Sequence, residues 1–307
     1  MSDLNSTPLV SVLMTAYNRE KFLGEAMASV LASTFNDFEL IVVDDCSTDG
    51  TVNIAQDFAA RDSRVRVYLN EKNLGDYPNR NRTASLARGR YLKYVDSDDL
   101  IYPHGLQILV ETMEQFPDAG YGVCTLEPDP VRIYPFQVAP VEAYWRHYFE
   151  RVVFHNGPLS SIIRRDAFES VGGFSGKQHV GDFELWHILS SRFPVVLMPQ
   201  GVVWERAHDN RQMTDNLTDV RVWLKYHLLS LRILQSEINP LHGKAKELVI
   251  LLARKRMARF ILVAIQSHGL VKALQLLQMS QLSLLQLLLY AFSRKVYQGY
   301  KPRPMPV

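Results

Sequence analysis

The chain has 307 residues, 47% of them hydrophobic and 21% charged, which is the composition of a globular protein with room for one large domain and an appendage. Its two cysteines, Cys46 and Cys124, exclude a disulfide framework and indicate a reducing compartment, and the polar residues 1–8 lead us to expect no signal peptide. The formal net charge of +2 is unevenly spread, because residues 241–307 hold eleven Lys or Arg and one acid and so carry +10, against −8 for the remainder.

Apolar runs alternate with helical patterns along the first hundred residues. We expect strands at 9–16, 38–43, 65–69 and 91–95, and helices at 20–33, after Ser47 or Thr48, and at 78–87. Strands that alternate with helices predict a doubly wound α/β sheet, mostly parallel and flanked by helices.

Polar side chains follow three of these strands. Tyr17 comes after the first, Asp45 after the second, and Asp96, Asp98 and Asp99 after the fourth. Ligands of such sheets bind beyond the carboxyl ends of the strands, so we expect these groups to share one cleft. Carboxylates this close need a cation, a proton or several donors between them, and their oxygens suit Mg²⁺ or Mn²⁺. A simple turn after the strand is the alternative that these residues alone leave open.

The chain from 103 to 210 continues in the same manner. Helices are expected at 103–116, 166–171 and 183–191, and strands at 121–125, 160–163, 195–198 and 202–205. Between them, Tyr144, Trp145, Tyr148 and Phe149 are spaced for one face of a helix, which favours core packing over sugar stacking. Asp182 opens the helix at 183 and so sets a carboxylate near its positive end.

Residues beyond about 215 show long Leu-rich helical runs. We therefore divide the chain into a catalytic domain, 1–215, and a basic helical extension, 216–307. Residues 273–293 carry no charge and could span a bilayer in length, but four glutamines and two serines, with a further serine at the end, make them too polar for a confident span. Three uses remain open: packing on the catalytic domain, dimerisation, or lying in a membrane interface with the basic residues at anionic headgroups.

Six segments in chain order resemble those of the family-2 glycosyltransferases with the GT-A fold. They are SVLMTAYN at 11–18, VVDDCSTDGT at 42–51, Arg80-Asn81, VDSDD at 95–99, GGF at 172–174 and GDFELW at 181–186. The resemblance covers about residues 9–210. It implies an inverting, metal-assisted transfer of a sugar from a nucleoside-diphosphate sugar, most often a uridine one, to a hydroxyl of a saccharide or lipid-linked acceptor in polysaccharide or glycoconjugate synthesis.

The resemblance also assigns roles to residues. Asp182 matches the general base, Asp98 the main metal ligand for Mn²⁺ or Mg²⁺, and Asp96 a group near the ribose and the metal. His208 matches loosely a residue that touches the metal or the diphosphate, and a satisfied polar histidine is the other reading. The donor side would comprise Thr15, Ala16, Tyr17, Asn18, Asp45, Arg80, Asp96 and Ser97. The acceptor side would comprise Gly172, Gly173, Phe174 and Trp186.

The chain departs from the family pattern in two places. Residues 75–79 (GDYPN) replace the small residues and alanine that often precede the Arg-Asn pair, so the donor pocket is expected to differ in shape. Gly181 stands where an acid often precedes the base, but Asp182 is kept and the base assignment stands.

Other functions fit the sequence less well. A receiver domain or a haloacid-dehalogenase-like phosphatase needs a partner lysine that the chain lacks between Lys93 and Lys177, and a Rossmann dehydrogenase needs a Gly-x-Gly-x-x-Gly run. The open alternative is a catalytically silent sugar-nucleotide-binding or scaffold protein with the same fold. We expect a cytoplasmic protein, peripheral at the inner face of the membrane, without a nucleic-acid partner.

Overall fold

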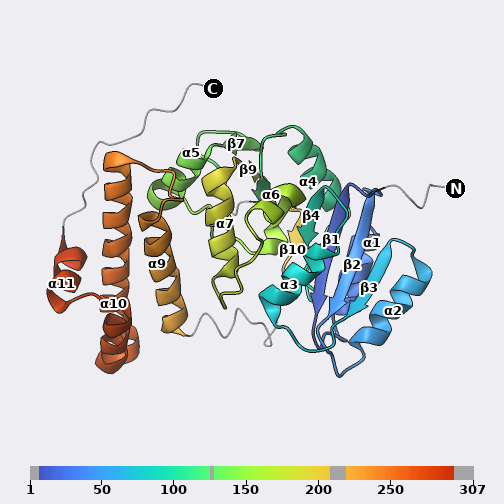
Figure 1. Ribbon diagram of the computed structural model, residues 1–307, viewed down its shortest axis with the longest axis horizontal. Helices are drawn as coiled ribbons and strands as arrows, with labels where there is room; N and C mark the ends of the chain where they lie inside the picture. The colour runs from blue at the N-terminus through green and yellow to red at the C-terminus, as the bar shows by residue number, and fades with distance from the viewer. Residues whose placement is uncertain (1–6, 125–127, 208–218, 294–307) are drawn as a thin grey trace.

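The computed structural model describes residues 7–124, 128–207 and 219–293 (Figure 1). Its main sheet has eight strands. They are β1 (Val10–Ala16), β2 (Phe38–Asp44), β3 (Val65–Leu69), β4 (Tyr91–Tyr94), β6 (Tyr121–Cys124), β7 (Phe136–Val138), β8 (Ser161–Arg164) and β9 (Val195–Met198). Their order across the sheet is β3-β2-β1-β4-β8-β6-β9-β7.

The first four strands form a parallel half-sheet. Val10 of β1 pairs with Phe38 of β2 on one side and with Tyr91 of β4 on the other, so the strands run in register toward a common edge. Every residue of β2 is buried, as expected for a parallel strand covered on both faces. The loops after β1, β2 and β4 therefore meet at one edge, as the sequence predicts.

Helices cover both faces of the sheet. Val12 and Met14 of β1 pack with α1 (Leu23–Leu31) and α4 (Gly105–Glu114), and α2 (Thr51–Arg61) lies beside α1. Leu13, which points the other way, belongs to the core shared with α3 (Asp76–Ser85) and α7 (Gly181–Arg192). The alternation of side chains along a strand thus divides the interior into two apolar layers.

Short elements fill the second half. The expected aromatic helix forms α5 (Pro140–Trp145) and continues as a π-helical turn (Arg146–Glu150); Tyr144, Trp145 and Tyr148 are buried, which confirms core packing. A 3₁₀ turn (Pro158–Ser160) precedes β8, and α6 (Arg165–Ser170) follows it. The strand expected at 202–205 is β10 (Val203–Trp204), which pairs with β5 (Leu100–Ile101) in a separate two-stranded sheet.

The described residues 219–293 form three helices, which lie at the end of the molecule away from the N-terminus (Figure 1). They are α9 (Val220–Gln235), α10 (Gly243–Ser280) and α11 (Leu284–Phe292). Leu224 of α9 and Met257 of α10 belong to the same core as Phe183 of α7, so this part of the extension packs on the sheet domain. The expected domain boundary near 215 lies outside the described residues.

Residues 273–293 do not form one helix. Gln281 has a left-handed φ of 59° and separates α10 from α11, and Gly269, with φ 81°, interrupts α10 itself. The single bilayer-length helix that the length of this uncharged run would allow is therefore not formed. None of the described helices is long and apolar enough to cross a membrane.

Candidate functional site

Asp45, directly after β2, fixes the loop that leads into α3. Its buried carboxylate accepts hydrogen bonds from the backbone N–H of Leu74 (2.8 Å) and of Gly75 (2.9 Å). Gly75 has φ 82°, a conformation that suits glycine, and begins the segment where the chain departs from the family pattern. Asp45 therefore holds one wall of the expected donor pocket.

Asn70 stands beside Asp45. Its Nδ2 donates to Asp45 Oδ1 (2.6 Å) and to Asn79 Oδ1 (3.0 Å). Its own Oδ1 is buried and accepts no hydrogen bond within the described part of the chain. Buried acceptors are almost always paired, so this oxygen fits an N–H group supplied by a ligand or a water molecule.

The loops after β1 and β2 are tied together. Ala16 is buried and Thr15 half-buried at the end of β1, while Tyr17 is exposed beyond it. Asn18 has a left-handed φ of 52°, and its Oδ1 accepts a hydrogen bond from the backbone N–H of Thr48 (2.8 Å). The structure thus brings these four expected donor-side residues next to the Asp45 loop.

Arg80 of α3 links two acidic side chains. Its Nε donates to Asp76 Oδ1 (2.7 Å), and a terminal nitrogen donates to Asp96 Oδ1 (2.7 Å). Burial alone would lower the pKa of Arg80, but the two carboxylates outweigh it and hold that pKa well above its usual value. Asp96 is thereby fixed at the carboxyl end of β4, next to the buried Ser97.

Asp98 and Asp99 are held by two arginines that the sequence reasoning missed. Arg19 Nε lies 3.4 Å from Asp98 Oδ2. The backbone N–H of Arg206 donates to Asp99 Oδ1 (2.7 Å), and its Nε donates to the carbonyl oxygen of Asp98 (3.0 Å). The guanidinium carbon of Arg206 lies over the ring of Trp204, 5.0 Å from the ring centroid. Arg206 therefore connects this acidic loop to β10.

The acidic loop has the chemistry of a metal site that shares its ion with a ligand. Asp96 and Asp98 offer hard carboxylate oxygens, and Mg²⁺ or Mn²⁺ is commonly held by one or two such groups plus substrate phosphates. Among the described residues, no three His, Cys, Asp or Glu side chains gather closely enough to hold an ion unaided. His208, the expected third group, lies outside them. The carboxylates of Asp96 and Asp98 therefore fit a cation that is also held by the phosphate oxygens of a bound ligand.

Asp182 lies in the first turn of α7. Its Oδ1 accepts hydrogen bonds from the backbone N–H of Phe183 (2.8 Å) and from the hydroxyl of Tyr77 (3.3 Å). Burial raises the pKa of Asp182, and these two hydrogen bonds together with the charge of Arg80 oppose the rise. A carboxyl whose pKa is raised in this way suits a group that takes up a proton.

The Gly172-Gly173 turn contacts α3. The φ angles are 80° at Gly172 and 69° at Gly173, and a Cβ atom on Gly173 would lie 2.6 Å from Asn81 Oδ1. Asn81 donates to the carbonyl oxygen of Phe174 (2.8 Å) and accepts from its N–H (2.9 Å). The ring of Phe174 stacks on Tyr77 at 5.2 Å, which connects this turn to the neighbour of Asp182.

Trp186, which the resemblance assigns to the acceptor side, is not at the surface. It is buried, stacks on Tyr121 with ring centroids 5.1 Å apart, and donates its indole N–H to the carbonyl oxygen of Asn156 (2.6 Å). Its ring belongs to the core beneath α7, so Trp186 could affect an acceptor only through the residues that contact its ring.

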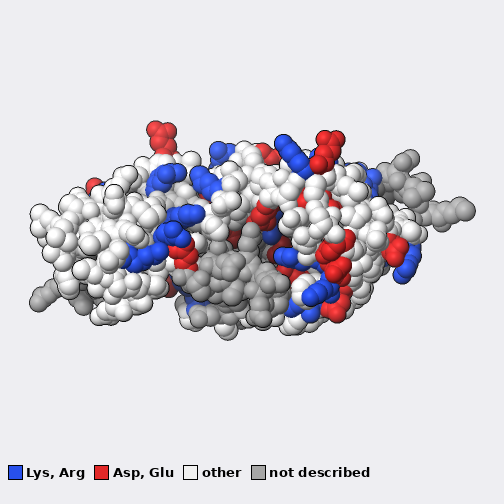
Figure 2. Space-filling view, turned by 90° about the horizontal axis from the view of Figure 1, so that it is seen from below, with Lys and Arg blue, Asp and Glu red and all other residues white. Residues whose placement is uncertain are grey.

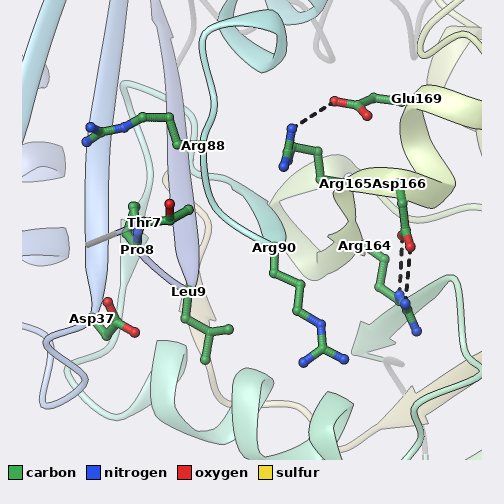
Figure 3. Close-up of a pocket in the computed structure, with 10 residues that line it drawn as sticks. All are labelled: Thr7, Pro8, Leu9, Asp37, Arg88, Arg90, Arg164, Arg165, Asp166 and Glu169. Atoms are coloured by element: carbon green, nitrogen blue, oxygen red, sulfur yellow. Dashed lines mark hydrogen bonds and ion pairs between the residues drawn. The ribbon is translucent and has the colours of Figure 1, made fainter. Parts of the chain in front are cut away.

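The site opens at the carboxyl edge of the sheet. Figure 2 views the molecule from below, toward this edge, and shows a hollow with acidic and basic side chains around it. A different cavity, of about 390 Å³, lies where the first strands begin (Figure 3). Each of its four arginines pairs with an acid, and one of these acids, Glu39, also pairs with Arg66 (2.7 Å). The pairs are Arg88–Glu39 (2.9 Å), Arg90–Glu114 (3.0 Å), Arg164–Asp166 (3.1 Å) and Arg165–Glu169 (3.2 Å).

Comparison with known protein families and curated proteins gives a consistent result. Residues 11–172 match the model of the family described as Glycosyl transferase family 2. TuaG of Bacillus subtilis (strain 168), named as a glycosyltransferase of teichuronic acid biosynthesis, is 36% identical over 131 residues, 41% of this chain and 52% of TuaG. The glycosyltransferase EpsE of the same organism is 40% identical over 190 residues, 60% of this chain and 67% of EpsE. The chain thus matches about half of one relative and two thirds of the other.

Solved structures share the fold at low sequence identity. TarS of S. aureus, residues 1–349 in complex with UDP-GlcNAc, superimposes with a TM-score of 0.68 over 92% of this chain and 81% of that one, at 18% identity. The mannosyltransferase PcManGT of Pyrobaculum calidifontis, in complex with GDP-Man and Mn²⁺, has a TM-score of 0.59 over 90% and 80% of the two chains, at 16% identity. These likenesses confirm the expected GT-A sheet with C-terminal helices.

Proposed function

The chain belongs to glycosyl transferase family 2, and we propose that it transfers a sugar from a nucleoside-diphosphate sugar to a hydroxyl acceptor in polysaccharide or glycoconjugate synthesis. The names of TuaG and EpsE, and the ligands of TarS and PcManGT, support this class of reaction. We further propose that residues 1–215 form the catalytic domain and residues 216–307 its helical extension.

The donor nucleotide is assigned to the carboxyl ends of β1 and β2. Tyr17 offers an exposed ring and Asp45 holds the pocket wall, while the unpaired Oδ1 of Asn70 can accept an N–H from a nucleobase. A uridine nucleotide is the favoured donor, as the UDP-GlcNAc complex of the structural neighbour suggests. The altered loop at 75–79 would then help to select the sugar nucleotide.

The diphosphate is assigned to the acidic loop and its arginines. Asp98 and Asp96 would hold Mn²⁺ or Mg²⁺, which when bound supplies Lewis-acid stabilisation of the leaving diphosphate. Arg19, beside Asp98, carries a guanidinium whose fork of donors matches phosphate oxygens. Arg206 acts as a positioning residue, because its hydrogen bonds fix the backbone of the acidic loop.

Asp182 is proposed as the general base. It accepts the proton of the acceptor hydroxyl while that oxygen forms a bond to the anomeric carbon and the diphosphate departs with the electron pair of the old bond. A single base on the side of the anomeric carbon opposite the leaving group predicts inversion at that carbon. The observation that supports this arrangement most directly is Arg80, which pairs with Asp96 on the donor side and whose charge also acts on Asp182.

Release of nucleoside diphosphate from a panel of sugar nucleotides in the presence of Mn²⁺ tests the proposal. We expect release from at least one donor, accelerated by a suitable saccharide acceptor, with an inverted configuration in the product. A donor that binds but is never turned over with any acceptor would favour the silent sugar-nucleotide-binding protein. A product that retains the donor configuration would contradict the role given to Asp182.

A further inference from the structure

Helix α11 exposes an apolar stripe. Five large side chains on it, Leu284, Leu285, Leu288, Leu289 and Phe292, are between 43% and 75% exposed. The opposite face of the helix, at Leu287 and Ala291, is already buried. Ser283 and Gln286 form a capping box at its start, so α11 is a preformed helix that presents these side chains outward. An apolar surface of this kind marks an interaction site.

Arginines border the other sides of α11. A cavity of about 420 Å³ between α9, α10 and α11 is lined by Arg232 and Arg254 together with Gln286 and Tyr290 of α11. None of the described residues that line it is acidic. Arg259 Nε donates to the carbonyl oxygen of Ala291 (3.2 Å), which places another cation at the end of the helix.

We propose that α11 docks on the surface of an anionic bilayer, with the apolar stripe in the headgroup region and lipid phosphates beside Arg232 and Arg254. An apolar helix face bordered by cations is the arrangement of interfacial helices, in which apolar insertion and electrostatic attraction act together. The stripe alone would fit any apolar partner. The arginine-lined cavity and the net charge of +10 in residues 241–307 favour an anionic surface over a neutral one.

The geometry also suits an enzyme that works at a membrane surface. In Figure 2, viewed toward the carboxyl edge of the sheet, the outer end formed by α10 and α11 is largely white, and a group of Lys and Arg side chains lies between that end and the hollow. The candidate site opens on the same side of the molecule.

Vesicle flotation of the full chain tests this inference independently of any catalytic activity. The probes are vesicles of phosphatidylglycerol mixed with phosphatidylcholine and vesicles of phosphatidylcholine alone. We expect flotation with the anionic vesicles only, weakened by added salt because exposed charges are screened. Leu285→Gln with Leu289→Gln should lower the bound-to-free ratio by ~10-fold or more, since two apolar side chains leave the interface.

A matched control is Val131→Gln with Ile133→Gln, two exposed apolar side chains in the sheet domain. All four positions are exposed, so both double variants should keep the melting temperature of the parent, and the control should float as the parent does. Flotation of the α11 variant at the parental level would overturn the inference. So would a parent that stays at the bottom and sediments as a dimer that the α11 variant cannot form, because a second copy would then cover the stripe.

Discussion

Asp182, the proposed general base, lies in an environment that changes the pKa of its carboxyl group. Burial raises the pKa of its carboxyl, and the hydrogen bonds from Phe183 and Tyr77 moderate the rise. Replacing Asp182 by Asn keeps the volume and removes the base. Turnover should fall by ~10²-fold or more while donor affinity stays nearly unchanged. Steady-state kinetics with a donor titration measures both, and parental turnover in the variant would remove Asp182 from the mechanism.

The pH dependence of the reaction provides a second test at this scale. A base works only when deprotonated, so kcat/KM should fall as pH drops through the pKa of Asp182. Because burial raises that pKa, the midpoint of this decrease, the acidic limb of the pH profile, should lie at a pH above the usual carboxyl pKa of about 3.9. Tyr77→Phe removes a hydrogen bond that favours the carboxylate and should move the limb to higher pH. An unchanged limb would show that Tyr77 does not contact the base in solution.

The sequence motifs located the carboxylates of the site but not the side chains that hold them. Asp99 and Asp182 lie within short motifs that are visible in the chain. Their partners Arg206 and Tyr77 are distant in sequence: Arg206 is 107 positions from Asp99, and Tyr77 is 105 from Asp182. Such pairs depend on tertiary packing, so no local pattern could have predicted them.

At the scale of elements, α3 and α7 meet at a glycine. A Cβ atom on Gly181 would lie 2.7 Å from the ring of Tyr77, closer than side chains approach one another. Gly181→Ala should therefore displace Tyr77 from Asp182 and destabilise the fold by ~1–3 kcal/mol, the usual cost of overpacking. Urea unfolding and kcat measure the two effects. Gly157→Ala is the matched control, because open space surrounds Gly157, and both parameters should stay near the parental values.

Two buried histidines join α7 to the π-helical turn. His187 Nδ1 lies 2.8 Å from the carbonyl oxygen of Phe183, and its Nε2 lies 2.8 Å from the hydroxyl of Tyr148. His147 Nδ1 accepts hydrogen bonds from two backbone N–H groups, the nearer at 3.1 Å. Burial lowers the pKa of His187 to about 3 and that of His147 well below its usual value. Both side chains are therefore neutral in the folded protein.

The unfolding free energy should consequently decrease in mild acid. Below pH ~6.5 each histidine binds a proton in the unfolded chain but not in the folded one, which costs up to ~1.4 kcal/mol per pH unit for each residue. The stabilisation is present above that pH and is lost as the pH falls toward the depressed folded pKa. Urea unfolding at pH 7.5, 6 and 5 measures the change in unfolding free energy. These pH values lie above the usual carboxyl pKa, so ordinary carboxyl groups contribute little to the change. His187→Gln should show a shallower slope than the parent, and an equal slope would exclude His187 as a source.

Periodicity predicted most of the elements and failed where the chain breaks locally. The strand at 195–198 matches β9 to the residue. β5 has two residues and β7 three, too short to show a period. The glycine at 269 was a visible signal for a break in α10, but the left-handed turn at Gln281 was not, because glutamine has no preference for that conformation. One continuous helix over 273–293 was therefore expected.

At the scale of the whole molecule, the mostly parallel sheet flanked by helices followed from the alternation of elements. The relation of the C-terminal helices to the sheet domain did not, because a Leu-rich helix can pack, dimerise or meet a membrane with the same pattern. The structure shows that α9 packs inward on α7, whereas α11 exposes an apolar stripe.

Calorimetric titration with sugar nucleotides tests the central claim, that the carboxyl edge of the sheet is a metal-assisted site for a nucleoside-diphosphate sugar. In the presence of Mn²⁺ we expect the parent to bind at least one donor, and a chelator or Asp98→Asn to weaken that binding strongly. Asp57→Asn, at an exposed acid on α2, should bind as the parent does. Failure of every donor to bind, or equal affinity with and without Mn²⁺ and in Asp98→Asn, would contradict the account.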